Sequence, residues 1–145
     1  MDKNRGEHHS KKGVATQMAS VSKGAAGEVL AARFLREKGY DILTTNYRCR
    51  FGEIDIIAVK KPYIAFVEVK TRNENALYTP REAVTLSKQK RLIQTARLYQ
   101  QQHPTKHQPR FDVIEVRTSL QSPMTALELE HIQNAYETGD LRAAF

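Results

Sequence analysis

Two oppositely charged side chains stand two positions apart in the segment Ala-Phe-Val-Glu-Val-Lys-Thr, where Glu68 is followed by Lys70. Residues i and i+2 of a β-strand point to the same face of a sheet, so a strand here would place a carboxylate beside an ammonium group. A second carboxylate, Asp55, lies in the preceding apolar segment, flanked by isoleucines. We therefore take Asp55, Glu68 and Lys70 as the candidate reactive groups.

Antiparallel pairing of the two segments would bring Asp55 toward Glu68. If residues 60–63 form a loop, Val59 pairs with Ile64, and the same register sets Asp55 opposite Glu68, with Cβ atoms about 4.5–5.5 Å apart. Two carboxylates that close resist joint ionisation unless a cation lies between them, and oxygen ligands suit Mg²⁺ or Mn²⁺. Lys70 would orient or deprotonate the attacking water, or neutralise charge on phosphorus oxygens.

A surface ion pair between Glu68 and Lys70, with Asp55 solvated, is the alternative interpretation. The spacing by itself favours this alternative, because charged alternation is common in half-exposed strands. The apolar neighbours of both acids favour the metal site, because burying an unpaired carboxylate is expensive.

Basic charge predicts a polyanionic partner. The 145 residues carry a formal net charge of +7 and the sequence pI is about 9.6, which favours DNA over an acidic or neutral partner. For Lys90 and Arg91, a solvated helix face is an equally good interpretation. The candidate DNA-contacting residues are Arg48, Arg50, Arg72, Lys88, Lys90 and Arg91.

The pattern of apolar residues predicts the elements that must hold these groups. We expect helices over residues 22–38 and 80–102, strands over 41–47, 53–59, 64–71 and 110–116, and a short helix over 126–136. This order indicates an α/β fold with a mixed sheet flanked by helices. Residues 1–21 read as a disordered basic arm, and residues 22–145 as a single domain.

Several features bound the location and the remaining candidates. The lone Cys49 fits a reducing compartment, and no apolar stretch reaches the ~20 residues that cross a bilayer, so we expect a cytoplasmic protein without a membrane partner. Asp112 and His131 are expected to be structural, and Cys49 an incidental thiol. The sequence leaves open whether the chain is a monomer or a homodimer.

Four sequence blocks, in order, resemble the YraN-type family of endonuclease-like proteins. They are Gly27-Glu28, the block Gly-Glu-Ile-Asp-Ile-Ile that begins at Gly52, the block Phe-Val-Glu-Val-Lys-Thr-Arg that begins at Phe66, and Arg-Phe-Asp-Val from Arg110. That family is placed in the PD-(D/E)XK nuclease superfamily, near archaeal Holliday junction resolvases. Each block is weak alone, but their joint occurrence is specific.

The resemblance implies a restriction-endonuclease-like fold and a role for each matching residue. Asp55 and Glu68 would bind the metal with the backbone carbonyl of Val69, Lys70 would be the catalytic lysine, and Glu28 would be the helix glutamate of resolvase-like members. Ile54 stands where the superfamily often has proline. The expected function is a Mg²⁺- or Mn²⁺-dependent endonuclease acting on DNA, including branched or single-stranded structures in repair or recombination. The alternative is a catalytically inactive DNA-binding module with a nuclease fold.

Overall fold

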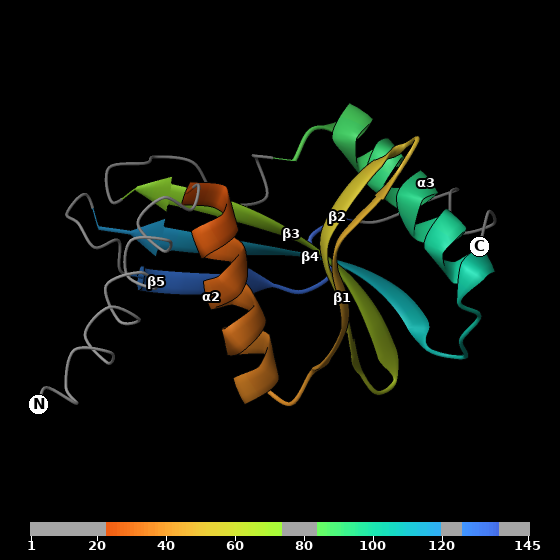
Figure 1. Cartoon of the computed structure of the whole chain (residues 1–145), viewed down its shortest axis with the longest axis horizontal. Coiled ribbons are helices and arrows are strands. Elements are labelled where there is room, and N and C mark those ends of the chain that lie inside the picture. Colours follow the sequence, from red (N-terminus) through yellow and green to blue (C-terminus); the bar gives the residue numbers. More distant parts are fainter. Residues whose placement is uncertain (1–22, 74–83, 120–125, 137–145) are drawn as a thin grey trace, which may run out of the picture.

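Two helices and five strands make up the fold in Figure 1, a computed structural model that describes residues 23–73, 84–119 and 126–136. The predicted disordered arm, residues 1–21, lies outside the described residues. No helix within the described ranges is long and apolar enough to cross a membrane. In chain order the elements are α2 (Lys23–Glu37), β1 (Asp41–Cys49), β2 (Gly52–Lys60), β3 (Tyr63–Asn73), α3 (Leu86–Gln102), β4 (Gln108–Thr118) and β5 (Ala126–Ile132).

The strands form one mixed sheet in the order β1-β2-β3-β4-β5. Its neighbouring strands are antiparallel except for β3 and β4, which are parallel. Parallel strands need a long connection, and here the connection contains α3. The predicted α/β class with a mixed sheet flanked by helices is therefore confirmed.

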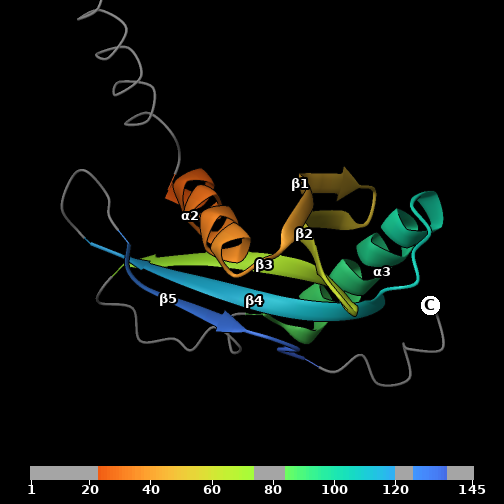
Figure 2. The same cartoon turned by 90° about the horizontal axis from the view of Figure 1, so that it is seen from below.

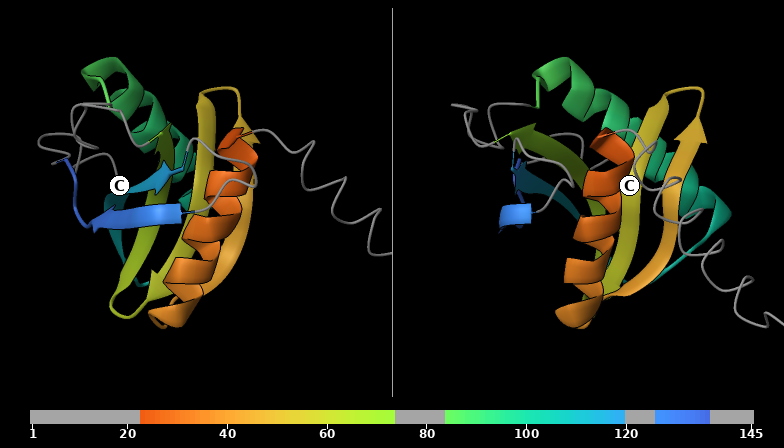
Figure 3. Two further views of the ribbon diagram at one scale, coloured as in Figure 1. Left: turned by 90° about the vertical axis from the view of Figure 1, so that its left-hand side faces the viewer. Right: turned by 60° about the vertical axis from the view of Figure 1, so that its left-hand side comes forward.

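Each face of the sheet is covered by one helix, as the right panel of Figure 3 shows with α2 in front of the sheet and α3 behind it. Alternation along β3 explains the two layers, because Phe66 and Val67 point to opposite faces. Val67 packs in a core cluster with Leu35 of α2. Phe66 packs in the other cluster with Leu92 and Ala96 of α3.

The predicted register between β2 and β3 is confirmed. Val59 pairs with Ile64, and the pairing runs to Ile56 with Val67, which leaves Asp55 and Glu68 as the next residues on the two strands. Lys60 also pairs with Tyr63, which makes the turn shorter than the expected four-residue loop.

The predicted helix over residues 126–136 is wrong, because residues Ala126–Ile132 form β5 and pair with β4. In Figure 2, β5 lies along the edge of the sheet beside β4. The second helix also begins later than its predicted start at Pro80. Thr85 caps it by accepting a hydrogen bond from the amide of Lys88 at 3.2 Å, so the first helical residue is Leu86.

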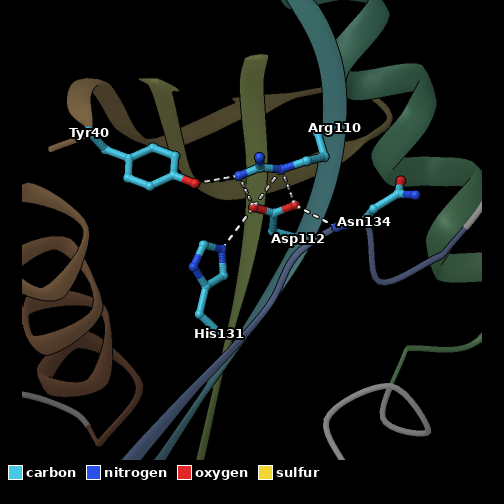
Figure 4. A network of polar contacts seen from close by, with 5 residues as sticks. All are labelled: Tyr40, Arg110, Asp112, His131 and Asn134. Carbon is cyan, nitrogen blue, oxygen red and sulfur yellow. Dashed lines mark hydrogen bonds and ion pairs between the residues drawn. The ribbon is translucent and has the colours of Figure 1, made fainter. Parts of the chain in front are cut away.

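A buried polar network ties the end of the described chain to the sheet (Figure 4). Asp112 accepts hydrogen bonds from Arg110 Nε at 2.9 Å and from the amide of Asn134 at 2.9 Å, and its Oδ2 lies 2.8 Å from His131 Nε2. Arg110 also donates to the hydroxyl of Tyr40. Burial alone would raise the pKa of Asp112, but hydrogen bonds from His131 and Arg110 outweigh it and lower the pKa. The predicted structural role of Asp112 and His131 is therefore confirmed.

Candidate active site

Two carboxylates from adjacent strands form the floor of the site. Glu68 of β3 is buried, with 7% of its surface exposed, and Asp55 of the neighbouring strand β2 is half-buried. The amide of Val69 donates to Asp55 Oδ2 at 2.7 Å, which fixes the Asp55 carboxylate against β3. The structure thus brings together the acids that the sequence paired.

The electrostatics of Asp55 show that the floor resists a second negative charge. Burial raises the pKa of Asp55 to about 8, and the nearby charges of Glu68 and Glu28 push in the same direction. The hydrogen bond from Val69 acts against this rise but is outweighed. A cation between the carboxylates would reverse the balance, because an opposite charge favours the ionised form.

Two lysines from different elements reach the same oxygen of Glu68. Lys70 Nζ lies 3.2 Å from Glu68 Oε1, and Lys88 Nζ of α3 donates a short hydrogen bond to that oxygen. Burial lowers the pKa of Lys70, and the neighbouring Lys88 lowers it further. Burial would also lower the pKa of Lys88, but the hydrogen bond to Glu68 outweighs it and raises the pKa. The two lysines are therefore electrostatically unlike: Lys88 holds its proton more firmly than Lys70 does.

A cavity of about 370 Å³ opens above the carboxylates. It lies between the β1–β2 hairpin and α3, which Figure 1 shows side by side. A Cβ atom added to Gly52 of the hairpin would lie 3.5 Å from Thr95 Oγ1 of α3. Its wall therefore combines acidic, basic and apolar groups. The lining residues are Phe51, Gly52, Glu53, Asp55, Glu68, Lys88, Arg91 and Leu92.

Glu28 reaches this region from the opposite face of the sheet through a close helix-to-strand contact. A Cβ atom added to Gly27 would lie 1.9 Å from Thr71 Oγ1, so only glycine lets α2 approach β3 this closely. The next residue, Glu28, lies near enough to raise the pKa of Asp55. With its amide nitrogen turned toward the acids, Asn46 bridges Glu28 and Glu53, with 3.0 Å to each carboxylate.

The basic residues predicted to contact DNA differ in how near they lie to the acids. Lys88 and Arg91 line the cavity, so the structure brings them to the acids. Lys90 is exposed on α3 and does not line it. Arg48 pairs with Glu53 at 3.2 Å and Arg50 lies over the ring of Phe51, and both partners line the cavity. Arg72 acts electrostatically on Glu115, which does not line it.

Asn46 and Phe51 belong to the site, and the sequence reasoning missed both. Asn46 adopts a left-handed conformation with φ 55° inside β1, which asparagine tolerates better than most residues. An asparagine inside a predicted strand that contains Thr and Tyr is unusual, and this is the sequence signal that could have identified Asn46. Phe51 stands between basic and glycine residues at the hairpin turn, an unusual place for a large apolar side chain.

Comparison with known proteins places the same residues in a shared region. A model of the uncharacterised protein family UPF0102, the YraN-type group, matches residues 27–116, which contain every acid and lysine of the site. A UPF0102 protein of Caldanaerobacter subterraneus is 44% identical over 114 residues, covering 78% of this chain and 93% of the relative. A Clostridium perfringens relative is 45% identical over 116 residues (78% and 92%), and one from Nocardia farcinica is 44% identical over 114 (78% and 87%).

Proposed function

We propose that this chain, which belongs to the uncharacterised protein family UPF0102, is a metal-dependent nuclease that hydrolyses phosphodiester bonds of DNA. The observation that carries the proposal is a pair of carboxylates, half-buried Asp55 and buried Glu68, on adjacent strands at the floor of a cavity with cationic side chains in its wall. The pKa of Asp55 is raised to about 8, and carboxyl groups with strongly raised pKa values cluster at functional sites.

The residues of the floor fit Mg²⁺ or Mn²⁺. Mg²⁺ typically takes one or two carboxylates and completes its shell with waters and a substrate phosphate. Asp55 and Glu68 supply that number, and the Val69 carbonyl is the further ligand that the family resemblance implies. Within the described ranges, no three or more His, Cys, Asp or Glu side chains lie together in a group that could hold a metal ion. When bound, the ion would supply Lewis-acid activation of the phosphodiester and lower the pKa of a bound water.

Lys70 and Lys88 have different roles in the proposed reaction. Burial lowers the pKa of Lys70, so its Nζ is the readier of the two ammonium groups to give up its proton and then to accept one from the attacking water. The raised pKa of Lys88 keeps an ammonium group beside Glu68, where it offsets negative charge developing on the phosphate oxygens. Arg91, on the same helix and in the cavity wall, is placed to hold a neighbouring phosphate.

A cleavage assay tests the proposal. Purified protein would be titrated with Mg²⁺ and Mn²⁺ on a panel of flap, junction, single-stranded and duplex DNA. We expect product only with metal, and a loss of about 10²-fold or more in rate for Lys70→Ala, the usual contribution of a positioned proton acceptor. The matched control is Lys90→Ala, which removes an exposed lysine outside the cavity and should cut at the wild-type rate.

Two results would refute the nuclease. One is the absence of product from every substrate across the metal titration. The other is equal cutting by Lys70→Ala and wild type, which would assign the activity to a contaminant or to another site.

A second candidate is a DNA-binding module without catalysis. One observation favours it: Lys70 and Lys88 already neutralise Glu68 through the same oxygen, so the acid is paired without any ion. This candidate predicts that the logarithm of the DNA-binding constant falls linearly with the logarithm of the salt concentration. It also predicts no cleavage product and no increase in affinity when Mg²⁺ is added.

A further inference from the structure

We infer that the cavity holds one unpaired nucleotide, whose base stacks on Phe51, so that the substrate is single-stranded at the site of cleavage. This inference rests on the proposed function and names its substrate class. It starts from the composition of the cavity wall, which combines an acidic floor with an aromatic ring, an apolar side chain and two cations.

The position of Phe51 suits it to stacking. The ring lines the cavity at the β1–β2 turn, and the guanidinium of Arg50 lies over the ring, 4.8 Å from its centroid. Arg50 is exposed, and an aromatic ring paired with an arginine is the combination found in platforms on which bases stack. A base that enters the cavity would meet the Phe51 ring, with Leu92 of α3 as a second apolar contact.

The size and charge of the cavity agree with one nucleotide. Its volume of about 370 Å³ lies at the lower end of the range of about 300–1,000 Å³ typical of small-molecule sites. Lys88 and Arg91 provide positive charge for the sugar-phosphate backbone, while Asp55 and Glu68 lie at the floor, where the scissile phosphate would reach them.

Paired bases would not reach the ring. In a duplex the faces of a base are covered by its neighbours, so stacking on a protein side chain requires the nucleotide to leave the helix. Single strands present these faces at no such cost, and they bind aromatic platforms with little sequence preference. The geometry therefore points to single strands, flaps or frayed ends rather than intact duplex.

A tryptophan reporter tests the stacking directly, since the chain contains no tryptophan. Phe51→Trp would be mixed with single-stranded oligothymidylate or with a blunt duplex, in Ca²⁺ buffer to measure binding. We expect single strands, and not duplex, to quench the fluorescence of the new indole. The control is Leu43→Trp, at an exposed position of β1 outside the cavity wall, whose fluorescence should not change with either DNA.

Affinity measurements complete the test. Phe51→Ala should bind single strands about 10-fold or more weakly than wild type and leave duplex binding unchanged, whereas Phe51→Trp should retain wild-type affinity. Circular dichroism would establish that Phe51→Ala is folded, and Phe51→Leu offers a second non-aromatic variant. The inference is overturned if the indole at position 51 is unaffected by saturating single strands, if duplex quenches it equally, or if no DNA binds.

These outcomes separate the inference from the nuclease proposal. Selective quenching by single strands in a protein that never cuts DNA would support stacking and refute the nuclease. Metal-dependent cutting with no quenching would do the opposite.

Discussion

Replacing Asp55 by asparagine should stabilise the metal-free protein in a manner that depends on pH. The pKa of Asp55 is raised from 3.8 to about 8 in the folded chain, so between those values the folded state binds more protons than the unfolded state. Wild-type stability therefore falls as pH rises through this window, by up to about 1.4 kcal/mol per pH unit. Asparagine is neutral throughout and still offers an oxygen to the amide of Val69.

The size of the effect follows from the same shift. A rise from 3.8 to about 8 corresponds to about 6 kcal/mol at about 1.4 kcal/mol per unit. Water in the cavity and the ammonium groups of Lys70 and Lys88 offset part of this cost once Asp55 ionises. We expect the free energy of unfolding of Asp55→Asn to exceed that of wild type by about 2–4 kcal/mol above pH ~8, with little difference near pH ~4.

Urea denaturation from about pH 4 to pH 9 in a chelator measures this difference. Asp41→Asn, the same substitution at an exposed position of β1, should follow the wild-type profile. Saturating Mg²⁺ should then stabilise wild type, by about 2.7 kcal/mol at 100 times the Kd, but not Asp55→Asn. Parallel pH profiles for wild type and Asp55→Asn would show that Asp55 carries its charge in the folded protein without penalty, which would remove the argument for a cation there.

Two further substitutions test the framework around the site by thermal or urea denaturation. Gly27→Ala should destabilise the fold by about 1–3 kcal/mol because its methyl group meets Thr71, whereas Gly24→Ala, with open space around it, should be neutral or stabilise by up to about 1 kcal/mol; equal effects would deny the close contact. Asp112→Ala should cost about 3–5 kcal/mol, since it leaves the buried Arg110 without its carboxylate. A loss below about 1 kcal/mol would mean that the network contributes little.

The sheet around the site could be predicted because local pattern and tertiary pairing agree there. The hydrophobic pattern and the tight turn between β2 and β3 set their antiparallel register, and that register brings the segments that carry the two acids side by side. The prediction for the last element was wrong because the segment Ala-Leu-Glu-Leu-Glu-His-Ile is rich in helix-forming residues, while its two-residue alternation fits a strand. Pairing with β4 decided between them, and pairing partners distant in sequence are invisible to local propensity.

The floor of the site was predictable, but its walls were not. Asp55, Glu68 and Lys70 lie on neighbouring strands, so strand alternation and one turn suffice to bring them together. Lys88 and Phe51 come from a helix and a hairpin whose approach depends on how α3 packs across the sheet. The direct hydrogen bond between Lys88 and Glu68 depends on this packing, and the sequence predicted only a phosphate contact for Lys88.

The absence of a side chain at Gly27 sets how closely helix α2 approaches strand β3. At Gly27 the backbone of α2 rests almost on the hydroxyl of Thr71, three positions beyond Glu68 on the same strand. Because the helix and the strand are already in contact at this point, Glu28 cannot move closer to Asp55 and Glu68 without a steric clash. In related chains, a larger residue at position 27 should be accompanied by a smaller one at position 71, and the two positions should change together.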